Sequence, residues 1–66
     1  MSIALNNIRT HKEYILTNYG EVFEFRVKEI ISHDEFVLQD IHTLEQYNMS
    51  ELIGRGKGKD FSIWER

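Results

Sequence analysis

The sequence predicts an all-β domain of residues 1–66: a small, five-stranded, strongly bent antiparallel barrel with one helical turn before the last strand. Three observations predict this class. Apolar and polar residues alternate with a period of two in several short runs, which is typical of strands with one wet face. Turn-forming residues such as Asn-Tyr-Gly at 18–20 separate these runs. The alternation breaks once in the longest run, which indicates a bulge that curls the sheet towards closure.

The first three strands are expected at 13–17, 21–31 and 36–41. The second has the clearest pattern, because three apolar residues alternate with three charged ones: Phe23, Phe25 and Val27 with Glu24, Arg26 and Lys28. At Glu29 the alternation stops and two isoleucines follow, so the bulge or bend is placed there. The third strand has apolar residues on both faces, which suggests a central or tightly curved strand.

The segment 43–53 has two interpretations. A single helix is supported by a capping-box pattern from Thr43 to Gln46 and by a terminal Gly54. Its apolar residues, however, scatter round a helical wheel and do not form one stripe. We therefore expect a short strand at 45–48, with Tyr47 and Met49 directed inward, and then one helical turn at 50–53.

The last strand is expected at 60–65, with Phe61 and Ile63 directed inward and Trp64 on the opposite face. Leaving a tryptophan ring in water forgoes the burial of about 150–250 Å² of surface. Coverage of Trp64 by the N-terminal residues is therefore the favoured interpretation. If exposed, Trp64 would instead form an aromatic platform with Tyr14 or Tyr19 nearby, suited to stacked bases or to extended peptides.

The N-terminal residues have the weakest pattern. We expect a short lead-in that packs Ile3, Leu5 or Ile8 over one open end of the sheet. A helix that runs into the first strand region is the alternative, because four residues fall near heptad spacing: Leu5, Ile8, Ile15 and Tyr19.

Three segments, which together make up about half of the chain, carry a resemblance: VFEFRVKEI, EFVLQDI and YNMSELIGRGKGKDFSIW. On these, the chain resembles the Src-homology-three-like small barrels, which include bacterial domains of KOW type and short single-domain bacterial proteins of unknown function. The resemblance implies a fold and no particular activity. It departs from the KOW pattern at Gly20, which lies in a turn and not within an alternating strand.

The charges are unevenly distributed along the chain, whose net charge is −3. Residues 29–53 hold six carboxylates and no Lys or Arg, whereas residues 54–66 hold four cations and two carboxylates. A chain with this net charge is not expected to bind polyanions in general, because long-range attraction follows the whole field. A local basic contact is still compatible with it.

The densest basic stretch is GRGKGKD at 54–60. A phosphate-binding P-loop is excluded, because Asp60 stands where a magnesium-binding Ser or Thr would follow Lys59 and because a strand comes next. Three interpretations remain. A mobile, solvated loop is favoured; the others are contact with an anion or nucleic acid, and docking to an acidic protein surface.

The sequence offers no basis for catalysis. It has no cysteine and no visible Ser-His-Asp arrangement, and His11, His33 and His42 lack the spacing of a metal site. We expect no cofactor and no metal. We also expect a cytoplasmic protein with no membrane partner, because the chain lacks the long apolar run of a membrane span and the pattern of a signal peptide.

We therefore predict a non-enzymatic interaction module that binds a protein or peptide. The alternative is binding of single-stranded nucleic acid through the glycine-rich loop and an aromatic platform. Weak homo-oligomerisation, with this loop against the acidic segment of a second copy, is a further hypothesis. The candidate contact residues are Arg26, Lys28, Arg55, Lys57, Lys59 and Trp64.

Overall fold

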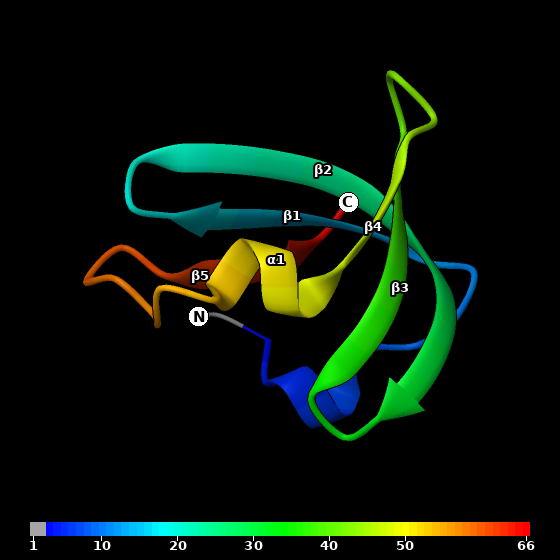
Figure 1. Cartoon of the computed structure of the whole chain (residues 1–66), viewed down its shortest axis with the longest axis horizontal. Coiled ribbons are helices and arrows are strands. Elements are labelled where there is room, and N and C mark those ends of the chain that lie inside the picture. The colour runs from blue at the N-terminus through cyan, green and yellow to red at the C-terminus, as the bar shows by residue number, and fades with distance from the viewer. Residues whose placement is uncertain (1–2) are drawn as a thin grey trace.

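The computed structural model describes residues 3–66 and contains one five-stranded antiparallel sheet (Figure 1). The strand order across the sheet is β4-β3-β2-β1-β5, so the last strand lies beside the first. The long strand β2 curves, and β3 and β4 therefore run across the direction of β1 and β5. The sheet is strongly bent, with β4 and β5 as its two edges. In chain order the elements are η1 (Leu5–Asn7), β1 (Glu13–Asn18), β2 (Glu21–Ser32), β3 (Glu35–Asp40), β4 (Gln46–Asn48), α1 (Met49–Ile53) and β5 (Ser62–Glu65).

Strands β1 and β2 form the predicted hairpin, in which Tyr14 pairs with Phe25 and Leu16 with Phe23. The two turn residues, Tyr19 and Gly20, have φ angles of 50° and 76°. Two-residue turns of this kind match the twist of the flanking strands, but they need positive φ at both central positions. The sequence Asn-Tyr-Gly therefore sets the register of this hairpin.

The predicted break in β2 is confirmed, and the structure has a second one that the sequence did not predict. The register between β2 and β3 shifts between Val27 and Glu29 and again between Ile30 and Ser32, so Lys28 and Ile31 are the extra residues. Each such bulge bends the strand and increases its twist. These two bulges lie in the half of β2 that carries β3 away from the direction of β1 (Figure 1).

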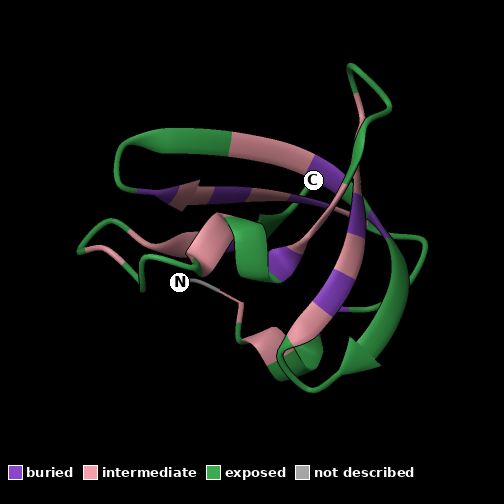
Figure 2. Ribbon diagram, viewed as in Figure 1, coloured by how far each residue is buried: buried purple, intermediate pink, exposed green. Residues whose placement is uncertain are grey.

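The core is enclosed by the bent sheet, and Figure 2 shows buried residues along β1, β2 and β3. Alternation along β1, β2 and β3 supplies most of it, as predicted. Helix α1 packs against β3 and β4 and adds Met49, while the N-terminal segment adds Ile8. The buried cluster consists of Ile8, Tyr14, Leu16, Phe25, Val27, Phe36, Leu38, Met49 and Ile63.

The ambiguous segment folds as a short strand followed by a helical turn, and the single-helix alternative is wrong. The capping box lies further along the chain than its sequence pattern suggested: Asn48 is the N-cap of α1, and its backbone N–H donates to the Glu51 carboxylate at 2.7 Å. Residues 41–43 form a turn instead. Glu51 thus satisfies a backbone donor that the start of a helix leaves unpaired.

The N-terminal lead-in packs against the core, as expected. Ile8 is fully buried, and Ile3 and Leu5 pack against the buried cluster. The backbone N–H of Ile3 donates to the carbonyl of Ile63 at 2.7 Å, so the lead-in also contacts the edge strand β5.

Candidate functional site

The outer face of β5, β1 and β2 carries an apolar patch around Trp64. Strand pairing places Trp64 beside Ile15, and Thr17 beside Val22. The exposed fraction is 45% for Trp64 and 62% for Val22. We call these four residues the Trp64 face.

Coverage of Trp64 by the N-terminal residues, the favoured expectation from sequence, is wrong. Alternation puts Ile63 in the core and therefore directs Trp64 to the opposite face of β5. The lead-in packs on the core side, where Ile8 is buried, and leaves the Trp64 ring exposed.

The sequence also proposed Tyr14 or Tyr19 as an aromatic neighbour of Trp64. Tyr14 is instead a core residue, with its ring centroid 6.4 Å from that of Phe25 and its hydroxyl accepting a hydrogen bond from the backbone N–H of Arg9 at 2.9 Å. An inward-facing position in β1 prevents it from joining a surface platform. Tyr19 lies in the hairpin turn, beside the glycine-rich loop.

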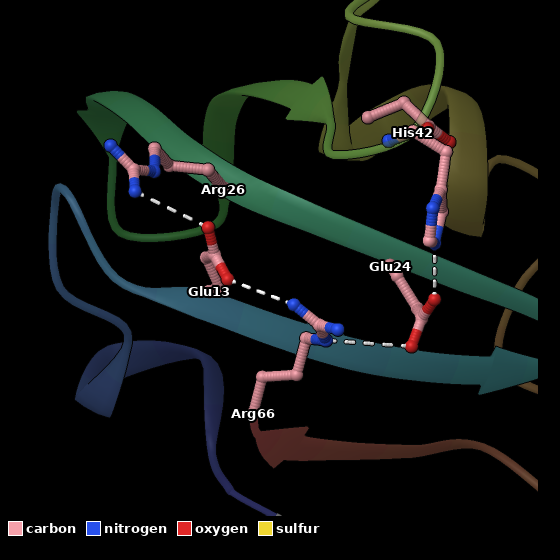
Figure 3. Close-up of polar contacts among 6 residues, drawn as sticks. Glu13, Glu24, Arg26, His42 and Arg66 are labelled. Carbon is pink, nitrogen blue, oxygen red and sulfur yellow. Dashed lines mark hydrogen bonds and ion pairs between the residues drawn. The ribbon is translucent and has the colours of Figure 1, made fainter.

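An ion-pair network borders the Trp64 face, because Glu24 pairs with Ile15, the neighbour of Trp64. Figure 3 shows its residues. We call it the rim network: Glu13, Glu24, Arg26, His42 and Arg66. The Glu13 carboxylate bridges the two guanidinium groups, at 3.2 Å from Arg26 Nη2 and 3.0 Å from Arg66 Nη1. The Glu24 carboxylate bridges Arg66 Nε at 3.5 Å and His42 Nε2 at 2.5 Å.

The network is electrically balanced, since two carboxylates face two guanidinium groups. The hydrogen bond with the His42 imidazole, together with the nearby charge of Arg66, holds the pKa of Glu24 below its usual value. Glu24 therefore stays ionised through the neutral pH range. Arg26, a predicted contact residue, is exposed as expected but is matched by a carboxylate.

Lys28 is exposed at the first bulge of β2. It lines a shallow cavity of about 240 Å³ together with Arg26, Gln39 and Leu44. Lys28 and Arg26 thus share the outer side of the sheet, as the alternation in sequence predicted.

The glycine-rich segment 54–60, which we call the basic loop, connects α1 to β5. The sequence favoured a mobile loop, but side chains of the hairpin hold its backbone. The Asn18 side chain donates to the carbonyls of Leu52 and Gly56, both at 3.1 Å, and accepts from the N–H of Gly58 at 2.8 Å. Asn18 is only 3% exposed, so these contacts are shielded from water.

A second anchor runs in the opposite direction, from the loop to the hairpin. The Asp60 carboxylate accepts the backbone N–H groups of Tyr19 at 2.9 Å and of Gly20 at 2.7 Å. The Tyr19 hydroxyl donates to the carbonyl of Arg55 at 3.2 Å. Hydrogen bonds thus connect the hairpin turn to both the start and the end of the basic loop, so the turn and the loop form one surface.

The three cations of the basic loop, Arg55, Lys57 and Lys59, are all exposed. The ammonium of Lys57 lies 5.1 Å from the centroid of the Phe61 ring, a cation–π distance. Within residues 3–66, none of the three forms an ion pair with a carboxylate.

The predicted contact residues therefore divide between two surfaces. Trp64, Arg26 and Lys28 lie on the outer side of the sheet, whereas the loop cations lie beside Asn18 and the hairpin turn. Along β1, Asn18 is three residues beyond Ile15, the partner of Trp64. Of the five residues that the nucleic-acid hypothesis combined, Arg26 and Trp64 therefore lie on the outer side of the sheet, and Arg55, Lys57 and Lys59 lie in the loop beside the hairpin turn.

Much of the acidic segment serves the fold. The hydroxyl and backbone N–H of Ser50 hydrogen-bond the Glu35 carboxylate and hold its pKa below the usual value. The backbone N–H groups of Thr43 and His42 do the same for Asp40, at 2.9 and 2.7 Å. Glu35 thus holds the start of α1, and Asp40 holds the turn after β3. These structural roles explain some of the excess of carboxylates in residues 29–53.

Comparison of the chain with models of known protein families, with curated proteins and with solved structures finds no match in any of the three. The class that the fold itself defines is a small all-β domain built on one bent antiparallel sheet. Among the described residues, no helix has the length and apolar character needed to cross a membrane.

Proposed function

We propose that this protein is a non-enzymatic interaction module of the Src-homology-three-like type, which binds a partner protein through the Trp64 face. The observation that carries the proposal is the exposed Trp64 ring beside Ile15, bordered by charges that already pair with one another.

The strand order supports the Src-homology-three-like part of the proposal. The last strand pairs with the first, and one helical turn separates β4 from β5, as in the small barrels that the sequence resembles. The edges β4 and β5 are not joined, so the proposal is for an open version of such a barrel.

The composition of the Trp64 face supports a protein partner. Tryptophan is among the residues most enriched at the energetic centres of protein interfaces, where an apolar centre is surrounded by a polar rim. Here the exposed Trp64 and Val22 lie at the centre, and the rim network lies at the border. Isolated apolar residues are common on protein surfaces, but a contiguous patch rimmed by polar groups is typical of an interaction site.

The charge balance of the rim network indicates the chemistry of the partner. Arg26 and Arg66 are each matched by a glutamate, so these two guanidinium groups are already engaged and are not free for phosphates. We therefore infer a folded protein partner whose contacting surface is apolar at its centre and close to neutral at its edge. A strongly charged partner would have to break ion pairs that this chain already makes.

The test is site-specific photo-crosslinking in the native host. A benzoylphenylalanine replaces Trp64 in one variant and Leu44 in the control, because Leu44 is exposed but lies in the turn between β3 and β4. We expect a discrete heterologous protein adduct from position 64 only. The partner identified in this way is then purified and titrated with the wild-type chain.

In that titration, Trp64→Ala is expected to weaken binding by about thirtyfold or more, the effect of losing an interface hot spot. Leu44→Ala should change the affinity by less than about twofold. Equal adducts from both positions, an adduct of twice the mass of the chain, or a purified partner that binds Trp64→Ala normally would each overturn the proposal.

A further inference from the structure

We propose that the basic loop and Tyr19 together form a contact site for single-stranded nucleic acid, separate from the Trp64 face. The phosphates would lie over the loop cations, and a base would stack on the Tyr19 ring. This inference does not depend on the partner-protein proposal.

The first argument is preorganisation. The buried side chain of Asn18 fixes the backbone of the loop at Gly56 and Gly58, and Asp60 fixes its far end to the hairpin turn. A ligand that meets a fixed backbone loses less conformational entropy than one that must order a flexible loop. The cations of the basic loop are thus presented from a defined scaffold.

The second argument is charge. Alternation with glycine places exposed cations at positions 55, 57 and 59. The two nearest carboxylates in sequence are already engaged with backbone N–H groups: Asp60 with the hairpin turn and Glu51 with Asn48. In the described part of the chain the three cations have no carboxylate partner, so they are available to phosphate oxygens.

The third argument is the position of Tyr19. Its ring packs on the loop so closely that a Cβ at Gly58 would lie 3.1 Å from Tyr19 Cδ1, whereas glycine leaves room. The ring is nevertheless more than half exposed, at 53%. Aromatic rings beside a cationic track are the usual means of binding single strands, because every base has a face that can stack.

A cavity of about 300 Å³ adjoins this ring, lined by Tyr19, Phe23, Leu52 and Arg55 on its apolar and basic sides. Glu21 and Glu51 lie on its acidic side. The carboxylates disfavour a phosphate inside the cavity but can accept hydrogen bonds from the N–H groups of a base, such as the N3–H of thymine. This places the base in the cavity and the phosphates over the loop, an arrangement that requires an unpaired strand.

The experiment measures the fluorescence anisotropy of a labelled twelve-nucleotide oligothymidine at several salt concentrations. We expect weak binding at low salt, with a slope of log affinity against log salt of about −2, the value for three phosphates on a single strand. Replacing the three loop cations together (Arg55→Gln, Lys57→Gln, Lys59→Gln) should reduce the affinity more than tenfold. A duplex of the same length should bind more weakly than the single strand.

Two substitutions of Tyr19 distinguish loss of base stacking from loss of the folded structure. Tyr19→Phe keeps the ring and should retain binding, whereas Tyr19→Leu removes it and should weaken binding by about fivefold to a hundredfold. The matched control is the pair Arg26→Gln and Lys28→Gln, which removes exposed cations from the outer side of the sheet and should change the affinity less than twofold. Trp64→Ala, which disables the Trp64 face, should likewise have little effect.

Several results would overturn this inference. They are no salt-dependent binding at all, equal loss from the outer-face control and the loop variant, a duplex that binds as tightly as the single strand, or Tyr19→Leu binding like the wild type while folded by circular dichroism. Failure here leaves the crosslinking result at Trp64 unaffected, so the two proposals fail separately.

Discussion

The side-chain oxygen of Asn18 accepts a hydrogen bond from the backbone N–H of Gly58 at 2.8 Å, although the two residues are 40 positions apart in sequence. Asn18 is the last residue of β1, and its side-chain amide also donates to the carbonyls of Leu52 and Gly56. One buried side chain therefore joins the hairpin, the end of α1 and the basic loop. Any function of the loop depends on this contact.

Replacement of Asn18 by alanine is expected to destabilise the fold by about 1–3 kcal/mol, the range for leaving buried backbone groups unpaired. The exposed Asn7, in η1, provides the matched control, since Asn7→Ala removes the same side chain from the surface. Urea denaturation of the two variants measures the difference in unfolding free energy. Equal stabilities would show that the loop does not need this anchor.

The sequence predicts local structure here much better than it predicts long-range contacts. The strands, the break at Glu29 and the helical turn before β5 follow from alternation and turn residues that are neighbours in the chain. The anchoring of the basic loop by Asn18 has no such signal, because an asparagine before a hairpin turn is already explained by the turn.

The same difference between local structure and long-range contacts applies to the surface residues. The outward direction of Trp64 followed from the alternation along β5, but its exposure depended on where the N-terminal lead-in packs. Glu24 pairs with His42, which lies 18 positions away in sequence, and the sequence predicted only one of the two bulges of β2 that lie between them. The Glu13–Arg26 pair follows from the register of the hairpin, but the pairs of Glu13 and Glu24 with Arg66 require β5 to lie beside β1, which the charges alone do not indicate.

Tyr47 and Tyr14 are expected to respond oppositely to loss of the hydroxyl group. The Tyr47 hydroxyl is buried and, within residues 3–66, has no hydrogen-bond partner; burial raises its pKa to about 12. Tyr47→Phe should therefore be neutral or stabilise the fold by up to about 1 kcal/mol, because a polar group without a partner is removed from the interior.

Tyr14→Phe is the matched control, since the Tyr14 hydroxyl accepts the backbone N–H of Arg9 at 2.9 Å. Its loss should cost about 1 kcal/mol, the net value of one such hydrogen bond. Thermal and urea unfolding of both variants give the comparison. A Tyr47→Phe variant that is less stable than Tyr14→Phe would contradict the assignment of the unpaired hydroxyl.

The fold is expected to lose stability in acid through Glu35, Asp40 and Glu24. Hydrogen bonds from Ser50, from the N–H groups of Thr43 and His42, and from the His42 ring hold the pKa of each carboxyl below its usual value. A lowered pKa in the folded state means that the ionised form stabilises the fold. The contribution is complete above the unfolded values of 4.5 for Glu and 3.8 for Asp, and it is lost as the pH falls through the folded values.

Glu35→Gln tests this dependence, because it keeps the shape of the side chain and removes the titrating group. Relative to the wild type, its urea midpoint should be lower at pH 7 and should fall less steeply as the pH drops below 4.5, the usual value for Glu. Glu29→Gln is the control, since Glu29 is an exposed residue of β2 and the change removes the same titrating group from the surface. Parallel pH profiles for wild type and Glu35→Gln would rule out the Glu35–Ser50 contact as a source of acid sensitivity.

Neighbouring residues of β5 should differ sharply in their contribution to stability, because alternation puts one in the core and the other on the surface. Ile63 is fully buried and pairs with Leu16, so Ile63→Ala should cost about 2–5 kcal/mol, enough to unfold much of a domain this small. Trp64 keeps 45% of its surface exposed and leaves no cavity in the core when it is truncated, so Trp64→Ala should cost less, about 1–2 kcal/mol. Urea unfolding followed by circular dichroism measures both variants without relying on the tryptophan. If Trp64→Ala proved as destabilising as Ile63→Ala, the ring would be holding the sheet together, and its exposure could no longer be attributed to binding.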